Sequence, residues 1–156
     1  MSLSKAREHL AKVGLDDRIM LFEQSSATVE LAAAAVGCEP ARIAKTLSFY
    51  LGDRVGLILF AGDARIDNRK FKDTFHTKAR MLSAADAETL IGHGVGGVCP
   101  FGANEICDVY LDESLRRFDV VYPAAGTPAS AVRLTIDELE RAVAPTRWID
   151  VSKLPQ

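Results

Sequence analysis

A glycine-rich stretch in the second half of the chain places the strongest limit on how this sequence can fold. Five of the eleven glycines fall within eleven positions, Gly92 to Gly102, which read Gly-His-Gly-Val-Gly-Gly-Val-Cys-Pro-Phe-Gly. Glycine lets the backbone approach a ligand and adopt either sign of φ, while Pro100 fixes one φ and removes one N–H donor. The stretch predicts a stiff loop lined with backbone amides, which suits an anion or a developing oxyanion. A connection selected only for turning fits the composition equally well, so other residues must decide.

The length and composition fit one soluble domain. A chain of 156 residues can bury one core but not two comfortable ones, so residues 1–156 are expected to form a single domain. No apolar run approaches the roughly 18 residues of a membrane span, and the first residues lack the apolar core of a signal peptide. We therefore expect a cytoplasmic protein with no membrane contact.

The cysteines argue against a metal site. Cys38, Cys99 and Cys107 are odd in number and widely spaced, without the paired spacing of a zinc site or the even count of a disulfide scaffold. We expect neither a metal nor any other cofactor.

Positive charge is concentrated in one segment. The formal net charge is 19 − 21 = −2, which gives no sign of a protein covered in nucleic-acid-binding charge. The segment 65–80 nevertheless holds six Lys or Arg residues against Asp67 and Asp73. This indicates a local phosphate-docking surface, although a solvated amphipathic helix has the same composition.

Capping residues and apolar runs predict short helices mixed with short strands. Helices are expected at 4–13, 29–36, 67–75, 83–91 and 135–143, with a helical turn at 113–117. Strands are expected at 19–22, 44–51, 55–60, 106–111, 119–122, 131–134 and 147–151. Gly52-Asp53 joins two of these strands as a hairpin, and the strand 55–60 is apolar enough to be buried on both faces. The fold class predicted is α+β, a mixed, barrel-like sheet surrounded by short helices, because the alternation is too irregular for a doubly wound parallel sheet.

The stretch Gly92–Gly97 satisfies G-x-G-x-x-G, the dinucleotide-binding fingerprint. That mechanism requires a strand before the glycines and a helix directly after them, so that the pyrophosphate meets the helix N-terminus. Here a helix is expected before the glycines, and Cys99-Pro100 follows them. The context argues against nicotinamide binding.

Nucleophilic catalysis finds weak support in the sequence. There is no G-x-S-x-G motif, and His9 and His76 are expected on surface helices or at their ends. His93 and Cys99 share the glycine loop and could form a Cys-His pair. Thiolate activation needs a geometry that a glycine-rich loop does not guarantee, so we favour an inert cysteine.

Lys45 is the most suggestive charged residue. It lies among Ile43-Ala44 and Thr46-Leu47 at the start of an apolar strand. A long cation there needs a packed stem and a head that reaches water or an anion. A lysine that reaches solvent at a strand end would also satisfy this pattern.

Several motifs together resemble the YbaK/EbsC family, which is related to the editing insertion of bacterial prolyl-tRNA synthetase. The resemblance extends from about Ile19 to Val151. Its motifs are Ala41–Phe49 with its Lys-Thr-Leu element, the Gly62-Asp63 turn, Gly96–Gly102 with its G-G-x-x-P-x-G loop, and Ala125-Gly126 before Val132–Leu134.

The resemblance implies a metal-free aminoacyl-tRNA deacylase that acts in trans and hydrolyses the ester of a small, wrongly attached amino acid. By this resemblance Lys45 matches the family's key lysine, expected to hold a terminal phosphate or the substrate end. Gly97 and Val98 match the loop whose backbone amides position the ester carbonyl. Substrate-binding residues are expected at Thr46, Gly96, Cys99, Pro100, Gly102, Ala125 and Gly126. Contacts to the tRNA are expected from Arg65, Arg69 and Lys70.

The chain departs from the family pattern at positions expected to line the aminoacyl pocket. Ile91-Gly92-His93 replaces a Thr-Gly-Tyr of some members, Cys99 replaces a loop serine, and Ala131 replaces an acid. Ala124-Ala125-Gly126 stands where a Ser-x-Gly is common. The amino acid removed is therefore open. A non-catalytic binder of tRNA ends or aminoacyl-nucleotides remains an alternative, as does a module that docks on a synthetase.

Overall fold

The computed structural model describes residues 2–24, 28–94, 97–144 and 147–155. Their strands are β1 (Ile19–Leu21), β2 (Ile43–Leu51), β3 (Arg54–Ala61), β4 (Arg65–Ile66), β5 (Cys107–Asp112), β6 (Val120–Pro123), β7 (Ser130–Val132), β8 (Leu134–Thr135), β9 (Arg147–Ile149) and β10 (Ser152–Lys153). Their helices are α1 (Ser2–Ala11), α2 (Val29–Val36), α3 (Asn68–Phe75), α4 (Ala84–Asp86) and α5 (Ile136–Val143), with the helical turns η1 (Asp16–Arg18), η2 (Pro40–Arg42), η3 (Ala87–Ile91) and η4 (Glu113–Arg117).

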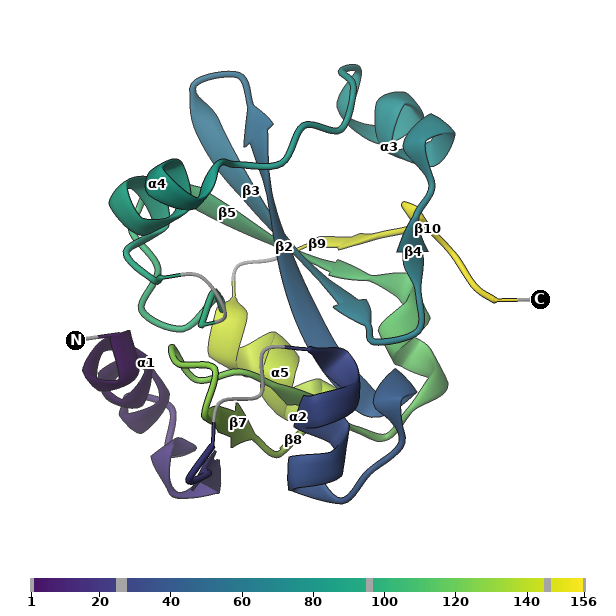
Figure 1. The fold of residues 1–156 in the computed structure, drawn as a ribbon. Coiled ribbons are helices and arrows are strands. Elements are labelled where there is room, and N and C mark those ends of the chain that lie inside the picture. The colour runs from purple at the N-terminus through teal and green to yellow at the C-terminus, as the bar shows by residue number, and fades with distance from the viewer. Residues whose placement is uncertain (1, 25–27, 95–96, 145–146, 156) are drawn as a thin grey trace.

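The strands build one mixed sheet in the order β8-β6-β2-β3-β5-β9, which curls through the molecule, and the pairs β1-β7 and β10-β4 (Figure 1). At its centre β2 and β3 form the predicted antiparallel hairpin, in which Leu51 pairs with Arg54 and Gly52 takes a φ of +64°. The flanking pairs β2-β6, β3-β5 and β5-β9 are parallel. The predicted class, a mixed barrel-like sheet with short helices, is confirmed.

Strand β3 is buried on both of its faces, as its composition predicts, because Val55 to Ala61 are all buried. The large cluster contains the fully buried rings of Phe49, Phe60, Phe71 and Phe101. Burial of one such side chain contributes about 1.5–3 kcal/mol. Phe101 belongs to the glycine loop, so the loop is anchored in the main core.

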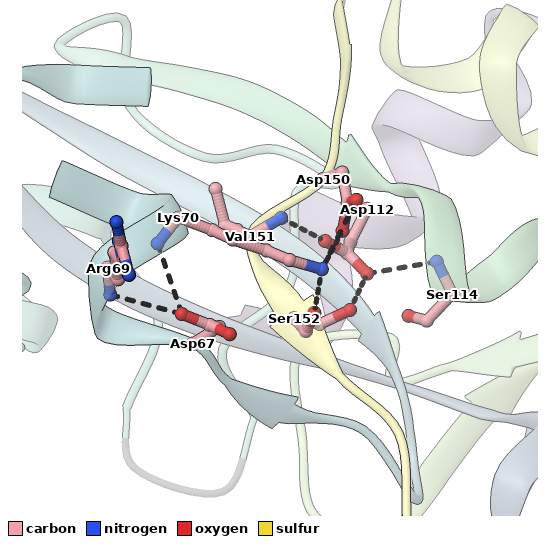
Figure 2. Close-up of polar contacts among 8 residues, drawn as sticks. All are labelled: Asp67, Arg69, Lys70, Asp112, Ser114, Asp150, Val151 and Ser152. Carbon is pink, nitrogen blue, oxygen red and sulfur yellow. Dashed lines mark hydrogen bonds and ion pairs between the residues drawn. The ribbon is translucent and has the colours of Figure 1, made fainter. Parts of the chain in front are cut away.

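Helix starts follow the capping residues. Thr28 Oγ1 accepts a hydrogen bond from Leu31 N at 3.1 Å, and Asp67 accepts from the first amides of α3 (Figure 2). Thr135 and Glu138 form the predicted capping box of α5. These short helices are therefore fixed by local side-chain chemistry.

Three predicted elements differ in the structure. The strand expected at 131–134 is two strands, because β7 pairs with β1 while β8 pairs with β6. The chain changes sheets at Arg133, whose N–H donates to Arg18 O at 3.3 Å. The strand expected at 147–151 ends at Ile149 as β9, and a further strand that was not expected, β10, follows at Ser152–Lys153 and pairs with β4. The helix expected at 83–91 is one α-helical turn, α4, continued by the π-helical turn η3.

None of the helices in the described ranges is long and apolar enough to cross a membrane.

Candidate functional site

A cavity of about 400 Å³ lies along β2, and α2, α4 and η3 contribute to its walls. This volume falls within the range of about 300–1,000 Å³ typical of small-molecule sites. Much of its wall is made of small apolar side chains, namely Ala32, Ala44, Ala84, Ala87, Ala124 and Ala131. Hydroxyl groups come from Thr28, Thr46, Ser48, Ser83, Tyr122, Thr127 and Ser130. The cavity therefore suits a small, largely uncharged group that offers hydrogen-bond partners.

Lys45 is the one charged side chain among the described residues that line this cavity. Its Nζ donates to Ala64 O at 2.5 Å and to Gly62 O at 3.3 Å. An ammonium has three donors, so one N–H remains for a ligand. Burial lowers the pKa of Lys45 from its ordinary value, while the nearby Asp63 acts in the opposite direction.

The turn that holds Lys45 depends on a glycine. A Cβ at Gly62 would lie 2.0 Å from Pro40 O, which is far inside van der Waals contact. Since no side chain fits there, Gly62 is required by close backbone approach rather than by its φ angle. The carbonyl that receives the Lys45 ammonium is thereby fixed against η2.

The helical turn η4 supports the same turn from the other side. Ala61 N donates to Ser114 Oγ at 3.0 Å, and Arg117 binds the carboxylate of Asp63. This ion pair holds the pKa of Asp63 below its usual range. The lysine is therefore placed by residues about 20 to 70 positions further along the chain.

The buried Asp112 anchors η4 in turn. Its carboxylate accepts from Ser114 N at 2.9 Å, from Val151 N at 2.9 Å and from Ser152 Oγ at 2.6 Å (Figure 2). A buried carboxylate with several hydrogen bonds is satisfied and rigid. Asp112 is therefore a structural residue of the support, not a group open to a ligand.

Thr46 carries an unusual hydroxyl. It lines the cavity, and its Oγ1 is buried without a hydrogen-bond partner among the described residues. Buried polar groups are nearly always paired, so an orphaned one calls for an explanation. A bound ligand would supply the missing partner.

The glycine loop reaches the cavity at Val98. Gly97 N–H is already occupied, because it donates to Gly94 O at 3.0 Å. Within the described ranges, no residue accepts a hydrogen bond from Val98 N–H. Of the two amides expected to position a carbonyl, that of Gly97 is engaged and Gly97 has a packing role, whereas that of Val98 has no acceptor among the described residues. Gly96 lies outside the described residues.

Gly97 packs directly on the loop 124–129 between β6 and β7, which contains Gly126 and is here called the second glycine loop. A Cβ at Gly97 would lie 2.3 Å from Gly126 O, and Gly126 itself has a φ of +91°. Neither Gly97 nor Gly126 contributes to the cavity wall, whereas Ala124 and Thr127 on either side of Gly126 do. The backbones of the two loops are therefore in direct contact, and this contact requires glycine because it leaves no room for a Cβ.

Four more expected substrate-binding residues lie behind the cavity wall. Cys99, Pro100 and Ala125 are buried, and none of them lines the cavity. Gly102 has a φ of +72° and lies against the backbone of Lys5. Thr46 is thus the expected substrate-binding residue that faces the cavity, and these others support the loops.

His93 and Cys99 meet in space but are sealed from solvent. Cys99 Sγ lies 3.7 Å from His93 Nε2, and both side chains are fully buried. Burial raises the pKa of the Cys99 thiol to about 12. It lowers the pKa of His93, whose Nε2 is 2.7 Å from Phe101 O. A thiol in this state is not a nucleophile, which agrees with the inert cysteine favoured by the sequence.

His9 lies in the last turn of the surface helix α1, but its side chain is half-buried and both of its ring nitrogens are engaged. His9 Nε2 lies 2.6 Å from Ala142 O, and Gly102 N donates to His9 Nδ1 at 2.9 Å. The imidazole therefore joins α1, α5 and the glycine loop.

The expected tRNA contacts differ in availability. Arg65 and Arg69 are exposed, and the charge of Arg65 is near enough to help lower the pKa of Lys45. Lys70 is already engaged, since its Nζ donates to Asp150 Oδ1 at 3.1 Å and to Ser152 O at 2.8 Å (Figure 2). In the part of the chain that is described, no three His, Cys, Asp or Glu side chains gather in a way that could hold a metal ion.

The fold and the site define the chain as an aminoacyl-tRNA editing domain. The model of that family matches residues 23–142, and the chain belongs to it. The resemblance to the YbaK/EbsC family is thereby confirmed.

Among its relatives, the protein YwhH of Bacillus subtilis (strain 168) is 49% identical over 154 residues, which cover 98% of each chain. The solved structure of a protein proposed as a trans-editing enzyme for prolyl-tRNA synthetase has a TM-score of 0.88 at 30% identity, with 97% of each chain covered. A proline–tRNA ligase of Caldicellulosiruptor bescii is 29% identical over 90 residues, which are 57% of this chain and 15% of the ligase.

Three residues that support the candidate site could not be found from the sequence. Ser114 and Arg117 act on the Lys45 turn from 53 and 54 positions away, and His9 meets Gly102 from 93 positions away. No motif spacing links such residues. The apolar face of α1 and the helix signal at 113–117 indicate elements, but not their partners.

Proposed function

We propose that the protein is a trans-acting deacylase that hydrolyses the ester between a small, wrongly attached amino acid and its tRNA. The observation that carries the proposal is the shared cavity of Lys45 and Val98, which belong to the two elements most characteristic of the family resemblance. Lys45 supplies a partly buried ammonium, and Val98 supplies a backbone amide that has no acceptor among the described residues. An aminoacyl ester with a nearby phosphate offers a partner to each, the phosphate to the Lys45 ammonium and the ester carbonyl oxygen to the Val98 amide.

The small apolar walls support the choice of a small aminoacyl group. Six alanines leave room in a cavity of about 400 Å³. No carboxylate of the described residues lines it, so a basic amino-acid side chain would find no ion-pair partner there. Small, uncharged side chains such as those of alanine and serine fit these walls best.

In the proposed mechanism Lys45 holds a phosphate or the substrate end, and Val98 N–H donates to the ester carbonyl oxygen. Water attacks the carbonyl carbon and gives up a proton, which a ribose hydroxyl of the substrate can relay toward the leaving oxygen. Negative charge then builds on the oxygen that Val98 N–H faces, where a positioned donor is most effective. The bond from carbon to the ribose oxygen breaks, and that oxygen takes a proton. The products are the free amino acid and uncharged tRNA.

Catalysis of this kind comes from position and from oxyanion stabilisation. It needs no protein nucleophile and no metal. The buried state of Cys99, with a pKa of about 12, supports the absence of a cysteine nucleophile. Arg65 and Arg69 would contact phosphates of the tRNA.

The test is a panel of mischarged tRNAs incubated with the purified protein. We expect hydrolysis of small aminoacyl esters and little hydrolysis of phenylalanyl or lysyl esters. Lys45→Ala should lower kcat/KM by about a hundredfold or more, in keeping with the range of about 10²–10³ for loss of one stabilising donor. The exposed Lys12 provides the control, because Lys12→Ala should leave the rate unchanged.

Retention of tRNA without hydrolysis would support the non-catalytic binder instead. Neither retention nor hydrolysis would point to a docking module for a synthetase. Normal turnover by a folded Lys45→Ala variant would refute the role of Lys45.

A further inference from the structure

The N-terminal helix α1 lies outside residues 23–142, the segment that matches the editing-domain family. It is nevertheless built into the core, since Ala6 and Leu10 are fully buried. Figure 1 shows α1 at the edge of the molecule, beside the region of the two glycine loops. Its inner face therefore contacts the structures that form the cavity wall.

Close backbone contacts tie α1 to both loops. A Cβ at Gly102 would lie 2.6 Å from Lys5 O, and a Cβ at Gly126 would lie 2.4 Å from Ser2 O. Gly126 in turn touches Gly97, next to Val98. Helix α1 thus contacts Gly102, on the C-terminal side of Val98, and through Gly126 it supports Gly97, on the N-terminal side. Both contacts restrict the position of the Val98 amide.

His9 makes the polar part of this contact. Because Gly102 N–H is a donor, His9 Nδ1 must accept, at 2.9 Å. Nε2 must then carry the hydrogen and donate to Ala142 O, at 2.6 Å. The two partners together assign one neutral tautomer.

The ring of His9 also packs on the loop. It meets Phe101 edge to face, with centroids 5.8 Å apart. Phe101 is fully buried, so the ring contact and the hydrogen bond hold two adjacent loop residues. Two contacts of different kinds fix the loop more firmly than either alone.

We propose that His9 is a positioning residue, which sets the place of the Gly97–Gly102 loop and thereby aims Val98 N–H into the cavity. Its role in hydrolysis rests on the proposed function. Its role in holding the loop does not. His9 does not line the cavity and would not touch the substrate.

The experiment compares three variants. His9→Phe keeps a ring against Phe101 but removes the acceptor and the donor. His9→Gln keeps one acceptor and one donor on a side chain that does not ionise. Glu8→Gln, at an exposed neighbour on the same helix, is the matched control.

The first readout is steady-state hydrolysis of a small aminoacyl-tRNA. We expect His9→Phe to lower kcat by about tenfold to a hundredfold, as small displacements of catalytic groups do, with KM within about twofold. His9→Gln should restore most of kcat, and Glu8→Gln should match the wild type. A purely structural role would lower the amount of folded protein but not kcat per folded molecule.

The second readout is amide hydrogen exchange followed by NMR. In His9→Phe we expect Gly102 N–H to exchange about tenfold faster, as fits the loss of one hydrogen bond, with a shifted Val98 amide resonance. His9→Gln should show neither change. If the wild type hydrolyses no ester, the proposed function fails, and this readout still decides the role of His9. Unchanged Gly102 exchange and an unchanged Val98 resonance in His9→Phe would overturn the inference.

Discussion

At the scale of one residue, the buried and unpaired hydroxyl of Thr46, a residue that lines the cavity, supports a ligand-binding role for this position. An unpaired buried hydroxyl costs free energy in the empty protein, and that cost is removed when a ligand pairs with it. Stability and function then place opposite demands on this position. Such a conflict is typical of binding sites rather than of cores.

Thr46→Val tests this conflict because valine has the same shape without the hydroxyl. We expect the free energy of unfolding to rise by about 1 kcal/mol, since an unsatisfied group is lost. The kcat/KM for hydrolysis should fall by about tenfold, the loss of one hydrogen bond to substrate. Denaturant unfolding and steady-state kinetics measure the two effects. Thr46→Ser, which keeps the hydroxyl, should retain activity, and a fully active Thr46→Val would disprove the contact.

Cys99 gives a second prediction at this scale. With a pKa of about 12 and no exposed surface, its thiol should not react with iodoacetamide at pH 8 while the protein is folded. It should react in denaturant, and a Cys38→Ser/Cys107→Ser background allows this thiol to be followed alone by mass spectrometry. Cys99→Ala should keep kcat within about threefold, because a cavity of one sulfur atom affects stability more than chemistry. A loss of several hundredfold would restore the nucleophile hypothesis.

At the scale of elements, the site is a contact between two glycine loops and one hairpin. The hairpin positions Lys45, and the loops position Val98. Gly94 and Gly97 belong to the same loop but differ in surroundings, since a Cβ at Gly94 meets nothing within 4 Å. A comparison of alanine substitutions at Gly94 and Gly97 therefore separates the effect of steric crowding from the general effect of replacing a glycine.

Gly97→Ala should lower kcat by about tenfold or more, because its Cβ would displace Gly126 and the adjacent Val98 amide. Gly94→Ala should leave kcat almost unchanged. Circular dichroism and thermal unfolding would show whether both variants remain folded. Equal rates for the two variants would mean that the contact between the loops does not position the ester.

The sequence predicts elements better than it predicts their neighbours. The hairpin, the capped helices and the burial of β3 follow from turn residues, caps and apolar runs, which act within a few positions. Arg133 shows where such reasoning stops. The alternation around it fits one strand, yet β7 pairs with β1 from the distant N-terminal part of the chain, while β8 pairs with the nearby strand β6.

The same limit applies to the site. Lys45 and the glycine loop could be recognised from residue types and motif order. The occupied amide of Gly97 and the contact of His9 could not, because both depend on packing between segments far apart in the sequence. Thr46 was expected to bind substrate, but its missing hydrogen-bond partner is visible only in three dimensions.

At the scale of the whole molecule, recognition of a tRNA must rely on local charge. The net charge of −2 gives no general attraction to nucleic acid, so phosphate contacts have to come from exposed cations near the cavity. Arg65 and Arg69 are both exposed, and Arg65 is near enough to Lys45 to help lower its pKa. Lys70, although in the same segment, is held by Asp150 and Ser152.

Arg65→Ala and Arg69→Ala should each reduce the slope of log affinity against log salt for tRNA binding by about one. Lys70→Ala should change the slope much less, because its ammonium is already paired. Filter binding between low and physiological salt would measure all three variants. Equal slopes for Arg65→Ala and the wild type would place the tRNA elsewhere.

The hydrogen bonds of Lys45 also bear on the order in which the site is assembled during folding. Its two carbonyl partners lie 17 and 19 residues away, whereas His9 contacts groups 93 and 133 residues away. Closing a short loop costs less entropy than closing a long one, so local contacts tend to form first. The Lys45 ammonium should therefore reach its two carbonyl partners while the β2-β3 hairpin is forming. The Val98 amide is fixed only when the most distant parts of the chain have met, so we expect the proposed anion-binding group to form earlier in folding than the amide proposed to face the ester.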